Sequence, residues 1–340
     1  MTSATREQKK LLYEQLIGQK LAGKFTITGL LGFGGMGAVY EAIQSPMDRK
    51  VALKLIPTYD PTAAARFERE AYTVSKLTHP NTVTVFDFGH TSDGHLYLSM
   101  EHLLGHTLTD LIRSVGPLNG ARAVHITQQI CRSLGEAHRQ GIIHRDVKPD
   151  NIFLINVDGD PDYVKVLDFG IAKVAQRHLT LTGEIVGTPR FMPPEQACGE
   201  ELDQRTDLYA AGMLLYCCLS GKAPFAGVQG PKVITLLVRG PTPLRELEPD
   251  LPPALLAVVD KAIAPEREKR FASAAAMAAA LRASLVDPAP PAATAAPDAP
   301  PEPDEPRERR RTPMTLLMVA LIVLAVVLGV GLTVFRHSLP

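Results

Sequence analysis

Four polar residues in the middle of the chain are of the types that can serve phosphoryl transfer. Asp146 and Asn151 lie in the stretch IIHRDVKPDNIFL with Lys148 between them, and Asp168 follows in VKVLDFGIAK. Transfer of a phosphoryl group needs neutralised charge and a positioned nucleophile, with little covalent help from protein. Asn151 and Asp168 supply hard oxygen ligands suited to Mg²⁺. Asp146 can orient a hydroxyl and accept its proton, while Lys148 can stabilise charge on the γ-phosphoryl group.

A glycine-rich stretch, LLGFGGMGAVYEA, lies well before these residues and contains Gly32-x-Gly34-x-x-Gly37. A dinucleotide site of the Rossmann type would continue into a helix, whereas AVYEAI is typical of a second strand. A Walker loop would end in G-K-[ST], which this stretch lacks. A hairpin that folds over a triphosphate, with Val39 on the base, and an ordinary tight turn both remain open on these residues alone.

The strand that follows, VALK, ends on Lys54. An ammonium there can reach the α- and β-phosphates beneath the glycine loop, and it needs a carboxylate to hold it. Glu70 is the candidate, because it falls at helical spacing with Phe67, Val74 and Leu77 on the apolar side of the following helix. The alternative is an ordinary Lys–Glu surface pair, which is common and contributes little.

The elements around these residues change character along the chain. KFTITGLLG, GAVYEAI and KVALKLI are short strand-like runs separated by turns. A helix should follow in DPTAAARFEREAYTVSKL, where Asp60 is placed as the N-cap and Pro61 at the first helical position. After Gly105 the periodicity is mostly helical. We expect a small β-rich lobe followed by a larger helical lobe.

The bulk composition excludes several classes of protein. The chain has 36 basic and 36 acidic residues, so the overall charge does not indicate a nucleic-acid partner. Its four cysteines show no C-x-x-C pair and no metal-ligand spacing, which favours reduced thiols. The first residues lack an apolar h-region, so we expect no cleavable signal peptide.

The C-terminal part predicts a membrane anchor. Residues 286–312 form a Pro/Ala-rich linker that ends in an arginine cluster, and 313–335 is an apolar run long enough for a transmembrane helix. The alternative is a buried core helix. Because excess Lys/Arg stays on the cytoplasmic side, we expect a single-pass protein of the inner membrane with its body in the cytoplasm. The tail 336–340 would then leave no room for an external sensor domain. Ala325 and Gly329 form a small-x-x-x-small pair, so a homodimer through this segment is an open alternative.

Taken together, the ordered motifs closely resemble the protein-kinase superfamily: G-x-G-x-x-G-x-V, V-A-L-K, H-R-D-x-K-x-x-N, D-F-G and GTPRFMPPEQA. The chain looks most like the bacterial eukaryotic-like (Hanks-type) serine/threonine protein kinases, whose P-E-Q-A is matched by Pro194 to Ala197. The resemblance implies an α+β fold of two lobes over residues 25–285, after an N-terminal extension, 1–24. It also implies transfer of the ATP γ-phosphate to Ser/Thr hydroxyls of proteins, with Mg²⁺, or Mn²⁺ as the alternative metal.

The resemblance implies a role for each matched residue. Lys54, paired with Glu70, would contact the phosphates, and Thr188 would brace Asp146 and Lys148. Glu195 would pair with Arg270. Asp207 would anchor the backbone of the catalytic loop, the H-R-D-x-K-x-x-N stretch from His144 to Asn151. The ATP lid and the adenine pocket would be formed by Leu31, Gly32, Phe33, Gly34, Gly35, Met36, Gly37, Val39, Ala52, Met100, Glu101, Leu103 and Phe153.

Regulation is predicted in the segment QRHLTLTGEIVGTP. A phosphate on Thr180 or Thr182 could pair with Arg145 and order this activation loop, the alternative being that both threonines are simply solvated. His102 and Pro193 depart from the commoner residues at their positions, and neither is a reacting group. Two other functions stay open, a membrane-tethered nucleotide-binding scaffold (a pseudokinase) and a kinase of small molecules.

Overall fold

The structure is a computed structural model of the 340-residue chain. It describes residues 3–34, 37–57, 61–170, 190–225, 236–237 and 239–285. The chain divides into two units, 1–287 and 288–340, and the described residues all belong to the first.

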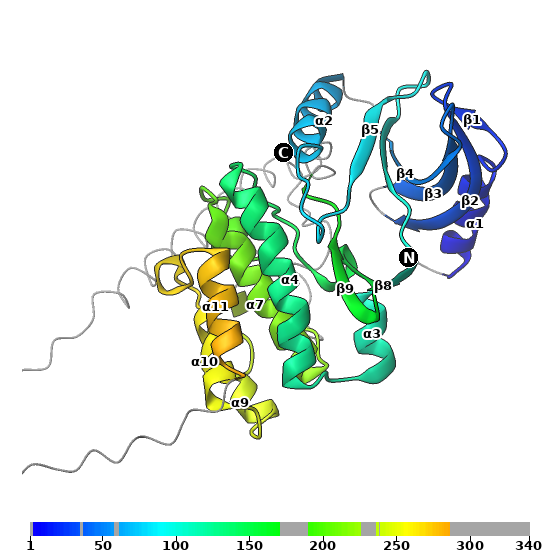
Figure 1. The fold of residues 1–340 in the computed structure, drawn as a ribbon. Coiled ribbons are helices and arrows are strands. Elements are labelled where there is room, and N and C mark those ends of the chain that lie inside the picture. Colours follow the sequence, from blue (N-terminus) through cyan, green and yellow to red (C-terminus); the bar gives the residue numbers. More distant parts are fainter. Residues whose placement is uncertain are drawn as a thin grey trace, which may run out of the picture. The chain divides into compact units, whose positions relative to one another are not determined.

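The N-terminal lobe is built on a six-stranded antiparallel sheet with the strand order β1-β2-β3-β4-β6-β5 (Figure 1). Its second hairpin strand shows why the sequence folds this way, because buried and half-buried residues alternate along it with the period of two that a strand imposes. Phe25, Tyr40 and Leu53 are fully buried on one face and form the core of this lobe. The strands are β1 (Lys20–Leu21), β2 (Phe25–Gly34), β3 (Gly37–Gln44), β4 (Arg49–Ile56), β5 (Val85–His90) and β6 (Leu96–Glu101).

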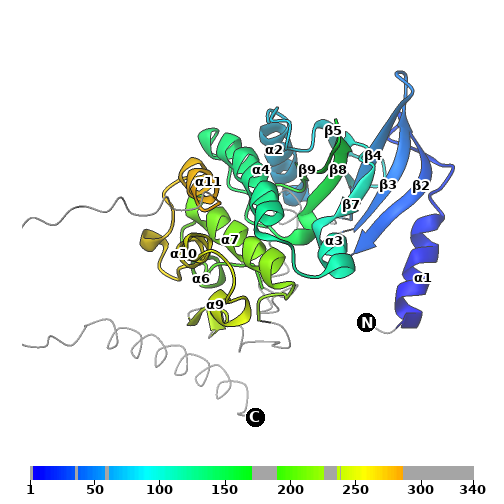
Figure 2. The ribbon, with the colours of Figure 1, turned by 60° about the horizontal axis from the view of Figure 1, so that its bottom comes forward.

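Two helices accompany this sheet, α1 (Ser3–Glu14) and α2 (Pro61–Val74). They lie on opposite faces of the sheet (Figure 2). The apolar face predicted for the second helix is confirmed, because Phe67 and Val74, together with Leu77 just beyond its end, are buried in the main core.

The C-terminal lobe is helical, with a small three-stranded sheet at the junction between the lobes. Helix α7 (Gln204–Ser220) is its centre, since every residue from Thr206 to Ser220 is buried, as expected of a helix enclosed on all sides. Gly212 permits the close approach of a neighbouring helix, because a Cβ there would lie 2.6 Å from that of Ala262. The other elements are α3 (Leu108–Val115), α4 (Gly120–Arg139), α6 (Pro194–Ala197), α9 (Leu244–Leu247), α10 (Pro253–Ala262), α11 (Ala274–Ala283), the 3₁₀ turns η1 (Pro149–Asn151) and η3 (Arg267–Lys269), and strands β7 (Gly105–Thr107), β8 (Ile152–Val157) and β9 (Asp160–Val166).

The two-lobed α+β architecture predicted from the sequence is therefore confirmed. In the part of the chain that the structure describes, no helix is long and apolar enough to cross a bilayer. Several predicted features lie outside the described residues: the linker 286–312, the segment 313–335, the tail 336–340, Gly35, Met36, Asp60, Thr180, Thr182 and Thr188.

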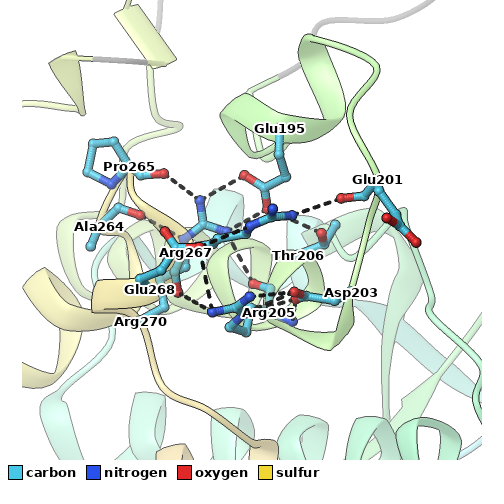
Figure 3. Close-up of polar contacts among 10 residues, drawn as sticks. All are labelled: Glu195, Glu201, Asp203, Arg205, Thr206, Ala264, Pro265, Arg267, Glu268 and Arg270. Atoms are coloured by element: carbon cyan, nitrogen blue, oxygen red, sulfur yellow. Dashed lines mark hydrogen bonds and ion pairs between the residues drawn. The ribbon is translucent and has the colours of Figure 1, made fainter. Parts of the chain in front are cut away.

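A buried ion pair links the segment before α7 to the segment before α11 (Figure 3). Two guanidinium nitrogens of Arg270 donate to the two carboxylate oxygens of Glu195, at 2.6 and 2.8 Å. The same guanidinium also donates to the carbonyl oxygens of Ala264 and Pro265, and the hydroxyl of Thr206 donates to Glu195. The predicted Glu195–Arg270 pair is thus confirmed, and it is bidentate.

Removing one partner of this pair should be strongly destabilising, because the other charge stays buried. We expect Arg270→Ala to lower the free energy of unfolding by about 3–5 kcal/mol. The matched control is Arg245→Ala, which breaks the exposed pair with Asp260 and should cost about 0–1 kcal/mol. Urea unfolding of both variants measures the difference, and equal losses would contradict this role of the buried pair.

Candidate active site

A cleft of about 1630 Å³ lies between the sheet of the N-terminal lobe and the loops that follow α4. Pockets for single small ligands are commonly about 300–1,000 Å³, so this cleft has room for a nucleotide and part of a second substrate. The sequence predicted residues that bind ATP or metal, catalyse transfer or regulate the activation loop. Of those that the structure describes, all but Glu70 line this cleft. The lining includes Leu31, Gly32, Phe33, Gly34, Gly37, Val39, Ala52, Lys54, Met100, Glu101, Leu103, Arg145, Asp146, Lys148, Asn151, Phe153 and Asp168.

One end of the cleft is apolar and suited to a planar base. Ala52 on β4 and Met100 on β6 are buried there with Val83, and three half-buried side chains pack against them: Val39, Leu103 and Leu167. The sequence prediction missed Val83 and Leu167. The position of Leu167 directly before Asp168 was the available signal for it, whereas nothing local marked Val83.

The glycine stretch forms the β2–β3 hairpin, so the strand predicted after it is confirmed and the helix of a Rossmann site is excluded. Gly37 is required by the fold itself, because its φ is +117° and a Cβ there would collide with the carbonyl of Leu55. Gly32 and Gly34 differ, since a Cβ on either would meet no protein atom within 4 Å. These two positions form an open cradle on the wall of the cleft, which fits phosphates that approach the backbone closely.

Lys54 reaches across the cleft to the other lobe. Its ammonium lies 2.7 Å from Oδ2 of Asp168, and its side chain is only 8% exposed. The Lys54–Glu70 pair expected from the sequence is not among the ion pairs of the described residues, although Glu70 is not without partners of its own. The Lys54 ammonium therefore balances the charge of the carboxylate that was predicted to hold metal.

The catalytic-loop residues converge on one carboxylate oxygen. Lys148 Nζ donates to Oδ2 of Asp146 at 2.8 Å, and Asn151 Nδ2 donates to the same oxygen at 3.0 Å. Asn151 Nδ2 also donates to the backbone oxygen of Asp146 at 2.8 Å. The amide nitrogen of Asn151 is occupied by these two hydrogen bonds. Its amide oxygen is therefore the atom suited to bind a cation.

Two oxygen-bearing side chains, Asn151 and Asp168, thus line the same cleft as the glycine cradle. No group of three or more His, Cys, Asp or Glu that could hold a metal occurs in the described ranges. A two-ligand set suits Mg²⁺ in particular, because Mg²⁺ keeps several waters and takes one or two carboxylates with substrate phosphates.

The backbone of the catalytic loop is fixed by Asp207, at the start of α7. This carboxylate accepts the N–H of His144 at 2.8 Å and the N–H of Arg145 at 2.9 Å. The ring Nε2 of His138 lies 2.8 Å from the same carboxylate. The predicted anchoring role of Asp207 is confirmed.

Arg145 and Asp168 adopt the left-handed backbone conformation, with φ of +63° and +51°. Such strain in non-glycine residues persists only where the surroundings hold it, and it is often found at functional sites. At Arg145 the carbonyl accepts a hydrogen bond from the amide of Gln196 at 3.0 Å, while Asp207 holds its N–H. The sequence prediction missed Gln196 in this role, although it lies in the quoted P-E-Q-A.

This arrangement has the chemical parts of a phosphoryl-transfer site. It combines an apolar base pocket, a glycine cradle, a buried ammonium, two metal-suited oxygens and a carboxylate held by a lysine and an amide. Such transfer depends on positioning and electrostatic stabilisation more than on covalent chemistry by the protein.

Comparison with known proteins agrees with this geometry. The family model described as "Protein kinase domain" matches residues 25–281. The chain is 40% identical over 281 residues to the serine/threonine-protein kinase pkn3 of Myxococcus xanthus, covering 79% of this chain and 51% of that relative. It is 39% identical over 273 residues to the serine/threonine-protein kinase PknB of Mycolicibacterium smegmatis, covering 77% of this chain and 43% of the relative. The chain therefore spans about half the length, or less, of the curated relatives it matches.

Two solved structures are also similar. The kinase domain of PknI from Mycobacterium tuberculosis, solved as a double mutant, has a TM-score of 0.64 and 27% identity, covering 79% of this chain and 98% of that one. Rad53 1–466 in complex with AMP-PNP has a TM-score of 0.64 and 25% identity, covering 80% of this chain and 68% of the other. The family match covers most of the chain and includes every residue that lines the cleft. The chain belongs to the protein kinase family.

Proposed function

We propose that the protein transfers the γ-phosphate of ATP to serine and threonine hydroxyls of other proteins. The observation that carries this proposal is that Lys54, Asp146, Asn151 and Asp168 line a single cleft beside an apolar base pocket and a glycine cradle. The neighbouring Rad53 structure, which holds AMP-PNP, supports a nucleoside triphosphate as the donor. The names of the curated relatives support serine and threonine as acceptors.

In this proposal each residue acts from the position it has in the structure. The Asp146 carboxylate orients the acceptor hydroxyl and accepts its proton as that oxygen bonds to the γ-phosphorus and the bond to ADP breaks. Lys148, on Oδ2 of the same carboxylate, stabilises negative charge that develops nearby. Lys54 holds phosphate oxygens and Asp168 together.

Divalent metal fits the site because the amide oxygen of Asn151 and the carboxylate of Asp168 would hold it. Bound there, Mg²⁺ would supply neutralisation of the phosphate charge. Mn²⁺ prefers similar oxygen ligands and stays an alternative.

Asp146→Asn should separate nucleotide binding from transfer. The amide cannot accept the hydroxyl proton, so we expect transfer to a generic protein acceptor to fall by about 10²–10⁴-fold, while the Kd for Mg-ATP stays within about threefold. Asp158→Asn, in the exposed β8–β9 turn, is the matched control and should keep full activity. Phosphate on the acceptor is read by mass spectrometry and the Kd by calorimetry.

Two outcomes would contradict the proposal. Tight Mg-ATP binding without transfer by the unaltered chain in lipid would favour the nucleotide-binding scaffold. Transfer to small molecules but to no protein would favour the small-molecule kinase.

We further propose that the kinase is activated by autophosphorylation at Thr180 or Thr182. Arg145 lines the cleft directly before the catalytic aspartate, so a phosphate on the activation loop would have a nearby guanidinium partner. One to three charge-assisted hydrogen bonds would form and order the loop.

The double variant Thr180→Ala/Thr182→Ala should lose at least about tenfold in activity, because each such hydrogen bond contributes about 1.5–3 kcal/mol. Phosphatase treatment of the unaltered chain should lower its activity to a similar level, and incubation with Mg-ATP should restore it after a lag. Unchanged activity of the double variant, with no phosphate found on the loop, would refute the proposal.

We also propose that residues 313–335 anchor the protein in the inner membrane, with the kinase domain in the cytoplasm. The support is the uncharged apolar run and the arginines that precede it. Substrates would then be proteins within reach of the linker 286–312. The homodimer through Ala325 and Gly329 stays a prediction.

Two arginines in the centre of this segment should prevent anchoring, because each raises the free energy of membrane insertion by about 2.5–3.5 kcal/mol there. We expect Leu324→Arg/Leu328→Arg to move the chain from the membrane to the soluble fraction after carbonate extraction. The control Leu324→Ile/Leu328→Ile should remain in the membrane. A soluble unaltered chain would contradict the anchor.

A further inference from the structure

The N-terminal extension carries a feature that the kinase site does not explain. Residues 1–24 precede the matched family region, which begins at residue 25, and within them α1 lies on the face of the sheet opposite α2 (Figure 2). The extension is fastened to the sheet just after the helix. Gly18 donates its N–H to the carbonyl of Ile27 at 2.9 Å, Ile27 donates to that of Gln19 at 3.0 Å, and β1 pairs with β2.

The last turn of α1 contacts the ATP lid directly. The ring of Tyr13 lies 5.7 Å, centroid to centroid, from the ring of Phe33, with 40° between the ring planes. Phe33 stands between Gly32 and Gly34, the two glycines of the open cradle. The helix therefore contacts the one large side chain that interrupts these glycines.

The backbone at Tyr13 is also held in place. The hydroxyl of Tyr40, a fully buried residue of β3, donates to the carbonyl of Tyr13 at 3.1 Å. Burial, and then the proximity of Tyr13, raises the pKa of Tyr40 to about 12. This hydroxyl therefore keeps its proton and remains a donor throughout the physiological pH range.

The side chains near the C-terminal end of α1 differ in how far they are buried. Tyr13, and Leu16 just beyond the end of the helix, are half-buried and pack against the core of the N-terminal lobe. Leu11 and Leu12, just before Tyr13, are largely exposed, at 60% and 62%. Burial thus concentrates at the end of the helix that meets the lid.

We infer that α1 is a brace for the ATP lid, in which Tyr13 positions Phe33 and so holds the glycine hairpin where it covers the phosphates of a bound nucleotide. Glycines make this hairpin conformationally free, and a nucleotide binds only to the fraction of molecules whose lid is in place. Tyr13 is a positioning residue, since it acts through Phe33. The inference rests on the proposed function of the cleft as an ATP site.

The test uses the full chain in lipid nanodiscs and measures the Kd for Mg-ATP by calorimetry. An aromatic contact of this kind has a strength that corresponds to about a 2- to 10-fold change in an equilibrium. We therefore expect Tyr13→Ala to raise the Kd by about 3- to 10-fold. Tyr13→Phe keeps the ring and should have the Kd of the unaltered chain. Leu12→Ala, at a neighbouring exposed position, should also leave the Kd unchanged.

A double variant shows whether the effect passes through Phe33. Tyr13→Ala should have no further effect on the Kd in a Phe33→Ala chain. Hydrogen exchange of the hairpin amides, without nucleotide, should be faster in Tyr13→Ala than in Leu12→Ala.

An unchanged Kd and unchanged exchange in Tyr13→Ala would overturn the inference. A further rise in the Kd when Tyr13→Ala is added to Phe33→Ala would also overturn it, because Tyr13 would then act by another route. These readouts need no catalysis, so a chain that binds Mg-ATP but transfers no phosphate would refute the proposed function alone. A chain that binds no nucleotide would refute both.

Discussion

The carboxylate of Asp207, 1% exposed at the start of the buried helix α7, holds the catalytic loop in the core of the larger lobe. It accepts two consecutive backbone N–H groups, those of His144 and Arg145, and it contacts the ring of His138. A buried carboxylate would be costly without such partners. Two of the partners here are backbone groups of the loop itself, so the contacts that satisfy the buried charge also position the loop.

The geometry of the catalytic loop and of its neighbours depends on this clamp. Arg145 is held in a left-handed conformation by Asp207 at its N–H and by Gln196 at its carbonyl, and the backbone then delivers Asp146 into the cleft. Gln196 is next to Glu195, whose buried pair with Arg270 fixes α6. The catalytic loop, which carries the proposed proton acceptor, is therefore hydrogen-bonded to α6. In the sequence, α6 follows the activation loop, where regulation is proposed. Across the cleft, the Lys54–Asp168 pair joins β4 to the segment after β9 and so links the two lobes through charge.

Local signals predicted much of this arrangement. The strand pattern after Gly37 was enough to predict a second strand there, and the spacing of Phe67, Val74 and Leu77 was enough to predict the buried face of α2. Residues inside ordered motifs were also predicted to share one site, and those that the structure describes line one cleft, Glu70 excepted.

Contacts between residues far apart in the chain were harder to predict. The partner of the Lys54 ammonium in the structure is Asp168, 114 residues away, and helical spacing had suggested Glu70. Val83 and Tyr13 carry no local pattern that marks a site, and the P-E-Q-A motif does not reveal the contact of Gln196 with Arg145. What these three residues do depends on which strand or loop the tertiary fold brings beside them. Burial and motif order can be read from the sequence, but the choice among nearby polar partners is made by packing.

If the Asp207 clamp places Asp146 for transfer, the most direct measurement is the single-turnover rate of phosphoryl transfer by Asp207→Asn. An amide of the same shape cannot accept both N–H groups, so one would face another donor and the loop would shift. Misplacement by about 1 Å can cost about 10²-fold in rate, and we predict a loss of that order with the Kd for Mg-ATP and the folded state retained. A rate equal to that of the unaltered chain would contradict this role, because the catalytic loop would then be positioned without the clamp.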